Sequence, residues 1–272
     1  MKDITIIIPI HQYDEKVGSY LKKAIESVNK CRKHYERGKL ITRIVCPLDV
    51  MKKLDMKELA SFDSEEILFT INNEEKTDFC TQINCAVNDV DTQFFSILEF
   101  DDTYTEKWFK MVSDYYEGNE SVSVFLPINV ILSANDNATA QFMNEIAWTG
   151  SFSNEMGFID WDCLQDYTTF NLTGGVFNTA DFKAAGGLKA SIKAAFNYEF
   201  LLRVTKKDLK VFVVPKEGYV HTLGREGSLI EEYSNTMEME EIVKWFDLAR
   251  IEYVFTEDRN QTIQHIKKEV LK

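Results

Sequence analysis

TIIIP (residues 5–9) opens the part of the sequence that decides the fold. Four β-branched residues in an unbroken row are typical of a strand that is buried on both faces, as in parallel sheets. Pro9 ends the row, because proline has no N–H to give to a sheet ladder. From about Glu15 to His34, apolar residues then recur at helical spacing. The N-terminal segment therefore predicts a buried strand followed by a helix.

The same alternation of strand and helix continues to about residue 117. Further strands are predicted at 41–45, 67–71 and 94–98, and further helices at 51–59, at 79–87 and from 108 onward. Repeated strand–helix–strand units predict a doubly wound α/β fold, with a mostly parallel central sheet and helices on both faces. Beyond this part we expect strands at 122–132 and 211–214, a helix near 198–204, and a C-terminal helical extension over 229–272.

Composition and charge narrow the classes of partner. The 272 residues include 31 Lys and Arg against 44 Asp and Glu, which gives a net charge of −13. This acidity disfavours general binding to nucleic acid or anionic lipid, because cationic side chains supply most of that affinity. The sequence lacks the ~20 consecutive apolar residues of a membrane span, and its N-terminus predicts a strand rather than a signal peptide. Five cysteines without a C-x-x-C pair fit reduced thiols, so we expect a cytoplasmic protein.

One acidic motif directly follows a predicted strand, in SILEFDD (96–102). Its acids are Glu99, Asp101 and Asp102, and ligands of open α/β sheets bind at this carboxyl end of the strands. Carboxylates two positions apart can share a hard divalent cation, which would suit a diphosphate substrate. Taken alone, the motif fits an acidic turn before the next helix equally well.

Four segments, in order, resemble the GT-A nucleotide-sugar glycosyltransferases of the family-2 type. They are TIIIPIHQYDEKVGSYLKKAIESV (5–28), CTQINCAVNDVDTQFFSILEFDD (80–102), FNLTGGVFNTADFKAAGGL (170–188) and NYEFLLRVTKKDLKVFVVPKEGYVHTLGREGS (197–228). The resemblance implies a GT-A-like catalytic domain over 1–228, with a nucleotide-sugar-binding half (1–117) and an acceptor-side half (118–228). It implies a hexosyl- or pentosyltransferase.

The resemblance also implies a donor site around the acidic motif. Asp101 would be the main metal ligand, with Asp102 and His221 beside it, for Mn²⁺ or Mg²⁺. The residues implied to contact the nucleoside diphosphate are Pro9, Ile10, His11, Asp49, Asn84, Glu99 and Arg225. Taken alone, His221 also fits an ordinary strand-end histidine, and Arg225 a solvated loop arginine.

The identity of the catalytic base stays open at the level of sequence. The acidic position implied by the resemblance falls on Asn197, whose amide cannot accept a proton, and Glu199 lies two residues further along. Glu199 is the first candidate for the base. Otherwise the base comes from another segment, such as Asp160 or Asp162, or the reaction retains anomeric configuration and needs no such base, or catalysis is lost.

The acceptor would bind near the paired glycines Gly174 and Gly175. Trp161 and Asp162 are further candidates for acceptor binding, because an indole beside acids can stack on a sugar. A surface loop with a core tryptophan is the alternative interpretation of that stretch.

Together with the acidic motif, the resemblance implies a metal-dependent glycosyltransferase that moves a sugar from a UDP-linked nucleoside diphosphate sugar to an acceptor hydroxyl, such as that of a glycan. Two alternatives stay open. One is a catalytically silent module that binds sugar nucleotides or glycans, and the other is a sugar transferase that acts on modified viral DNA. The net charge of −13 weighs against the second.

Overall fold

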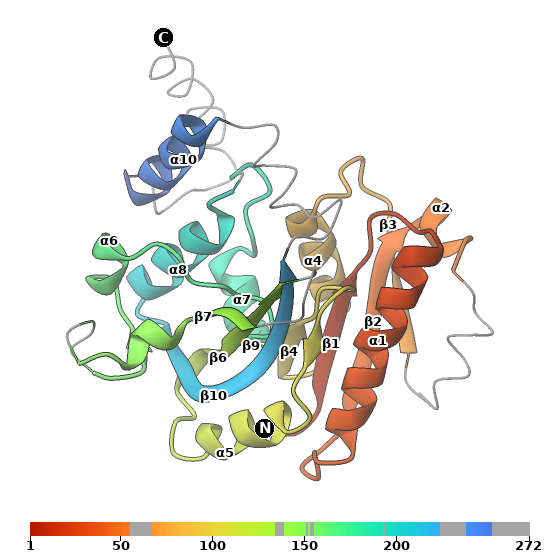
Figure 1. The fold of residues 1–272 in the computed structure, drawn as a ribbon, viewed down its shortest axis with the longest axis horizontal. Coiled ribbons are helices and arrows are strands. Elements are labelled where there is room, and N and C mark those ends of the chain that lie inside the picture. Colours follow the sequence, from red (N-terminus) through yellow and green to blue (C-terminus); the bar gives the residue numbers. More distant parts are fainter. Residues whose placement is uncertain are drawn as a thin grey trace.

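The computed structural model describes residues 1–54, 67–133, 139–150, 152, 155–192, 194–223 and 238–251. Its strands are β1 (Ile4–Pro9), β2 (Leu40–Pro47), β3 (Ile67–Asn72), β4 (Phe94–Ile97), β5 (Thr103–Tyr104), β6 (Val122–Ser133), β7 (Thr139–Met143), β8 (Phe158–Ile159), β9 (Val176–Asn178) and β10 (Lys210–Leu223). Its helices are α1 (Glu15–Arg32), α2 (Leu48–Met51), α4 (Phe79–Asn88), α5 (Trp108–Tyr116), α6 (Cys163–Asp166), α7 (Thr179–Ala185), α8 (Phe196–Lys206) and α10 (Met239–Ile251), with a 3₁₀ turn at Glu145–Trp148. Within the described residues, ten strands form one sheet in the order β3-β2-β1-β4-β9-β6-β10-β5, with β7 on β6 and β8 on β10 (Figure 1).

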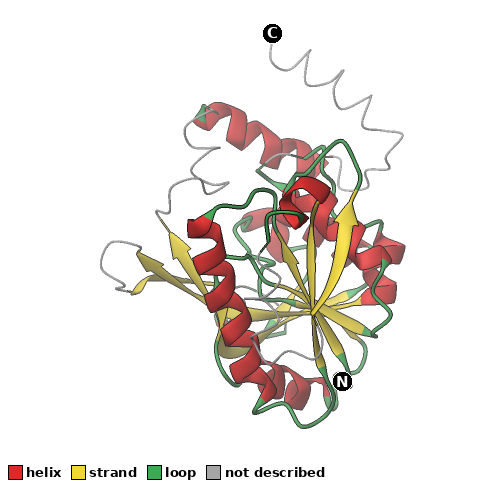
Figure 2. Cartoon of the chain, turned by 90° about the vertical axis from the view of Figure 1, so that its right-hand side faces the viewer, coloured by secondary structure: helices red, strands yellow, loops and turns green. Residues whose placement is uncertain are grey.

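β1 lies in the parallel part of the sheet, between β2 and β4. Its alternate residues enter two different cores, as the period of a strand requires. Ile6 and Ile8 pack with α1 and α5, whereas Ile7 packs with α4, α7 and α8. Helices therefore cover both faces of the sheet (Figure 2), which confirms the predicted fold class.

Two helices of the first half begin at aspartates that cap them. Asp14 accepts a hydrogen bond from the backbone N–H of Val17 at 2.8 Å, and Asp78 accepts one from Thr81 at 3.0 Å. The predicted helices at 15–34 and 79–87 are confirmed as α1 and α4. The helix predicted at 51–59 is wrong in its described part: α2 covers Leu48–Met51, and residues 52–54 form a turn. Residues 55–66 lie outside the described part.

β10 is much longer than the predicted strand at 211–214. It runs parallel to β6, and irregular register between Val213 and Tyr219 lets Pro215 fit without breaking the pairing. Within this irregular stretch, Gly218 sits against Trp108: a Cβ there would lie 2.4 Å from the indole ring. The extra length carries β10 to Leu223 and so to the carboxyl end of β4.

The short strands β5, β7, β8 and β9 were not predicted, because runs of two to five residues give too weak a pattern. At the C-terminus, α10 packs on α8, with the rings of Tyr198 and Phe246 5.7 Å apart. Of the predicted helical extension over 229–272, residues 229–237 and 252–272 lie outside the described part. Among the helices that the structure describes, none combines the length and apolar character of a membrane span.

Candidate metal centre

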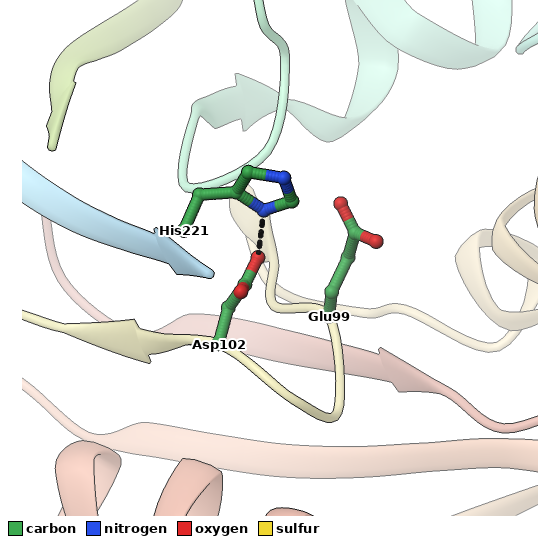
Figure 3. Close-up of side chains that lie close together, drawn as sticks. All are labelled: Glu99, Asp102 and His221. Atoms are coloured by element: carbon green, nitrogen blue, oxygen red, sulfur yellow. Dashed lines mark hydrogen bonds and ion pairs between the residues drawn. The ribbon is translucent and has the colours of Figure 1, made fainter. Parts of the chain in front are cut away.

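The acidic motif forms the turn between β4 and β5, at the carboxyl end of β4. Because β5 pairs antiparallel with β10, the last part of β10 runs beside this turn. Ligand atoms of Glu99, Asp102 and His221 consequently lie within 4.8 Å of one another (Figure 3). The turn and a histidine 119 positions after Asp102 thus meet in one group, which we call the acid–histidine cluster.

β10 holds the acidic turn at three points. Nδ1 of His221 lies 2.7 Å from Oδ2 of Asp102, and the backbone N–H of Thr222 donates to Oδ1 of the same carboxylate at 3.1 Å. The hydroxyl of Tyr219 accepts a hydrogen bond from the backbone N–H of Glu99 at 3.0 Å. Asp102 is only 1% exposed, so these contacts compensate for the loss of water around its carboxylate.

The charges of the cluster favour a protonated imidazole when no cation is bound. Burial alone would lower the pKa of His221, but the hydrogen bond and charge of Asp102, together with the charges of Glu99 and Asp101, raise it from 6.5 to about 9. Below this pKa, Nδ1–H of His221 donates to Asp102. Binding a cation through the imidazole at neutral pH would therefore release a proton.

We expect the folding stability of the metal-free protein to fall as the pH rises from about 6.5 to about 9. Because the pKa of His221 is higher in the folded chain than in the unfolded one, its stabilisation is complete below the unfolded value and is lost as the pH passes about 9. The loss is at most roughly 3 kcal/mol. Urea unfolding in EDTA at about pH 6 and about pH 9.5 measures it. Asp102→Asn should remove most of the difference between the two, and an undiminished difference would contradict this assignment.

The cluster supplies two carboxylates and one imidazole. Carboxylate oxygens suit Mg²⁺ and Mn²⁺, and a neutral imidazole nitrogen extends the set toward transition ions. This donor set and its spacing fit a divalent cation. Among the described residues, the group contains Glu99 rather than Asp101, the predicted main ligand. Asp101 adds its charge to the field that raises the pKa of His221, and its role as a ligand stays a prediction.

Three residues predicted to contact the donor stand at the end of β1, at the same edge of the sheet. Pro9 is the last residue of β1, and the buried Ile10 follows it, its carbonyl accepting from Nε2 of Gln82 at 3.0 Å. His11 is exposed, and its ring meets that of Phe100 edge-on, with centroids 6.2 Å apart. The structure therefore brings His11 beside the acidic motif.

Asp49 and Arg225 were also predicted to contact the donor, and the structure describes only the first of them. Asp49 is exposed in the first turn of α2, just after β2. Since β2 is parallel to β1, Asp49 shares the carboxyl edge with the cluster. Arg225 lies outside the described residues.

Asn84, predicted to contact the donor, is hydrogen-bonded to a distant part of the chain, and its contact with a donor stays a prediction. Its Nδ2 donates to the carbonyl of Leu188 at 2.7 Å, and its Oδ1 accepts from the N–H of the same residue at 2.9 Å. Gly187 makes this approach possible, because a Cβ there would lie 2.4 Å from Oδ1 of Asn84. We therefore assign Asn84 to joining α4 to the segment after α7.

Glu199, the first candidate for the catalytic base, lies in a buried ion pair. It is fully buried in α8, and its carboxylate receives Nε and Nη2 of Arg203 at 2.7 and 2.9 Å. The same guanidinium also donates to the carbonyls of Ala185 and Gly187. This buried ion pair fits a structural role for Glu199, and its role as the catalytic base stays a prediction. Asn197, in the first turn of α8, is half-buried.

The paired glycines lie beside β4 but are themselves buried. The N–H of Gly174 donates to the carbonyl of Ile97 at 2.8 Å, and the carbonyl of Gly175 accepts from Oγ of Ser96 at 2.7 Å. Gly174 has φ +78°, and a Cβ there would lie 2.6 Å from the ring of Tyr219. The close approach that requires glycine is thus to Tyr219 rather than to an acceptor.

The other acceptor-side residues lie around α6. Trp161 is half-buried. Nζ of Lys206, in the last turn of α8, lies 5.0 Å from its ring centroid, and this contact occupies one face of the indole. Asp162 is exposed at the start of α6, while Asp160 accepts from the N–H of Cys163 at 2.8 Å. Their roles toward an acceptor stay predictions.

Sequence reasoning missed Tyr219 and Thr222. A signal for Tyr219 was present, because residues two apart on a strand share a face and Tyr219 is two positions before His221. Thr222 contributes its backbone N–H, so its side-chain type carried no signal.

Comparison with known proteins places the fold. No family model matches the chain, and no curated protein matches it. Among solved structures, residues 1–349 of S. aureus TarS in complex with UDP-GlcNAc match 96% of this chain and 69% of that one, with 13% identity and a TM-score of 0.63. TarS 1–349 alone matches 93% and 82%, with 13% identity and a TM-score of 0.62. The UDP complex matches 96% and 68%, with 13% identity and a TM-score of 0.56. The chain therefore has the GT-A-like fold that it shares with TarS.

Proposed function

We propose that this protein transfers a sugar from a UDP-linked nucleoside diphosphate sugar to an acceptor hydroxyl, with a divalent cation, Mn²⁺ or Mg²⁺, at the acid–histidine cluster. The observation that carries the proposal is the meeting of Glu99, Asp102 and His221 at the carboxyl end of β4. This is the edge at which open α/β sheets bind ligands. The fold is shared with TarS, whose structures include complexes with UDP-GlcNAc and with UDP.

Charge explains why a cation would be needed there. A diphosphate brought to an acidic motif in a chain of net charge −13 would be repelled. A cation held by Glu99, Asp102 and deprotonated His221 would neutralise the diphosphate and stabilise the charge of the leaving nucleotide. Thr222 holds the Asp102 carboxylate through its backbone N–H, and exposed His11, beside the acidic motif, would contact the donor. We include Asp101 and Arg225 in the donor site on the strength of the sequence resemblance.

Titration calorimetry with UDP and UDP-GlcNAc, with and without Mn²⁺, tests the donor and the cation together. We expect binding that strengthens at least about tenfold when Mn²⁺ is added, because the cation screens the diphosphate. His221→Ala should remove this dependence, whereas His34→Ala, on the surface of the segment after α1, should preserve it. Equal affinity for UDP with Mn²⁺ and in EDTA would overturn the metal-dependent proposal.

One observation favours a second candidate, a module that binds nucleotide sugars without transferring them. Arg203 and burial sequester the carboxylate of α8, and the neighbouring Asn197 is an amide. Release of UDP from UDP-sugars separates the two candidates. Turnover with Mn²⁺ supports the transferase, and tight binding without release over hours supports the module.

A further inference from the structure

Tyr219 lies between the acidic turn and the paired glycines. Its side chain is fully buried, and its hydroxyl accepts the backbone N–H of Glu99 at 3.0 Å. Its ring rests on the backbone of Gly174, where a Cβ would lie 2.6 Å from Cδ2 and 2.7 Å from Cγ. The Tyr219 side chain therefore contacts the acidic turn through its hydroxyl and the loop that carries Gly174 and Gly175 through its ring.

The surface on which this ring rests is fixed. The N–H of Gly174 donates to the carbonyl of Ile97 at 2.8 Å, and its carbonyl accepts from Nε1 of buried Trp108 at 2.9 Å. The ring of Tyr104 packs edge-on against Tyr219, with centroids 5.6 Å apart. With the ring confined on these sides, the position of its hydroxyl is set by the surrounding backbone and rings.

We propose that Tyr219 is a positioning residue that sets the distance between Glu99 and the Asp102–His221 pair. Asp102 is tied directly to His221 and Thr222, whereas the backbone of Glu99 is tied to β10 through the Tyr219 hydroxyl. Tyr219 and His221 lie two residues apart on β10, so the strand presents the anchor and the imidazole on one face. Only the consequence for cation affinity rests on the proposed function, because the hydrogen bond itself is independent of it.

Tyr219→Phe removes the hydroxyl and keeps the ring. We expect amide hydrogen exchange at Glu99 to accelerate by about tenfold and Mn²⁺ affinity to weaken by about five- to tenfold, in line with the loss of one buried hydrogen bond. Tyr198→Phe is the matched control, since that buried hydroxyl donates to the carbonyl of Leu164, outside the cluster. It should lower the unfolding temperature without either effect.

A second pair of variants tests whether a shift of the Tyr219 ring at Gly174 is transmitted to the backbone of Glu99. Gly174→Ala should also accelerate exchange at Glu99, because the new Cβ displaces the Tyr219 ring. Gly118→Ala imposes a similar strain at φ +87° where nothing lies within 4 Å, and should leave Glu99 unchanged. In the Tyr219→Phe background, Gly174→Ala should add little at Glu99, because the hydroxyl that transmits the shift is gone.

The outcomes separate this inference from the proposed function. Unchanged exchange at Glu99 in Tyr219→Phe would overturn the positioning role, whatever the protein binds. Faster exchange at Glu99 in that variant, with a wild-type protein that binds no Mn²⁺, would support the positioning role and overturn the metal-dependent function. Faster exchange together with unaltered Mn²⁺ affinity would show that Tyr219 holds the turn without setting the cation site, and so would also overturn the inference.

Discussion

Replacing Asp102 with asparagine is expected to weaken Mn²⁺ binding by at least about 100-fold, and with it the cation-dependent binding of UDP. Asparagine keeps the shape of the side chain and can still accept the N–H of Thr222. It removes the charge that would hold the cation and that, after the hydrogen bond with Asp102, contributes most to raising the pKa of His221. The protein should therefore fold while losing the cation site, and Mn²⁺ titration followed by calorimetry with UDP measures both effects.

Two comparison variants sharpen this test. Asp114→Asn removes an equal charge from an exposed acid that pairs with Arg37 and Lys110, and should leave Mn²⁺ affinity unchanged. Asp101→Ala tests the sequence resemblance, which makes Asp101 the main ligand and predicts that turnover is abolished with the fold intact. If Asp101→Ala binds Mn²⁺ as the wild type does and only Asp102→Asn fails, the grouping of Glu99, Asp102 and His221 describes the site. If Asp102→Asn keeps full affinity, the cluster is not the cation site.

Replacing Arg203 with leucine is expected to lower the free energy of unfolding by about 3–5 kcal/mol, because it leaves the Glu199 carboxylate buried without its countercharge. The cost is large because both groups are almost fully buried, with 3% and 0% of their side chains exposed. The carbonyls of Ala185 and Gly187 lose their donor as well. Urea unfolding at neutral pH measures the loss.

The double variant Glu199→Leu/Arg203→Leu distinguishes a structural ion pair from a catalytic carboxylate. It should be more stable than Arg203→Leu alone, because it removes the uncompensated charge. If turnover of a UDP-sugar is found in the wild type, the double variant should keep it. A cost below about 1 kcal/mol for Arg203→Leu, as for an exposed pair, would instead favour Glu199 as the catalytic base.

The local pattern of the sequence determined the elements of the first half. The β-branched row before Pro9 predicted β1, and apolar residues at helical spacing predicted α1 and α4, because burial on a strand or a helix face selects residues at that element's own period. The same reasoning placed SILEFDD at the carboxyl end of β4, so the acidic motif of the candidate site was identified from the residues alone. Glu199 and Arg203 are also spaced i, i+4 on α8, although the ion pair between them was not predicted.

Tertiary structure alone decided which of these groups work together. Asp102 meets His221 across 119 positions only because β5 pairs with β10, and Asn84 meets Leu188 across 104 positions because the segment after α7 lies beside α4. Burial is also invisible in the sequence. The sequence shows that Glu199 is a carboxylate, but only the fold shows that its ion pair with Arg203 is closed off from solvent. Spacing within one element is fixed by backbone geometry and can be read from the sequence. Contact between elements, and the exclusion of water that sets a group's charge and reach, depends on how the whole chain packs.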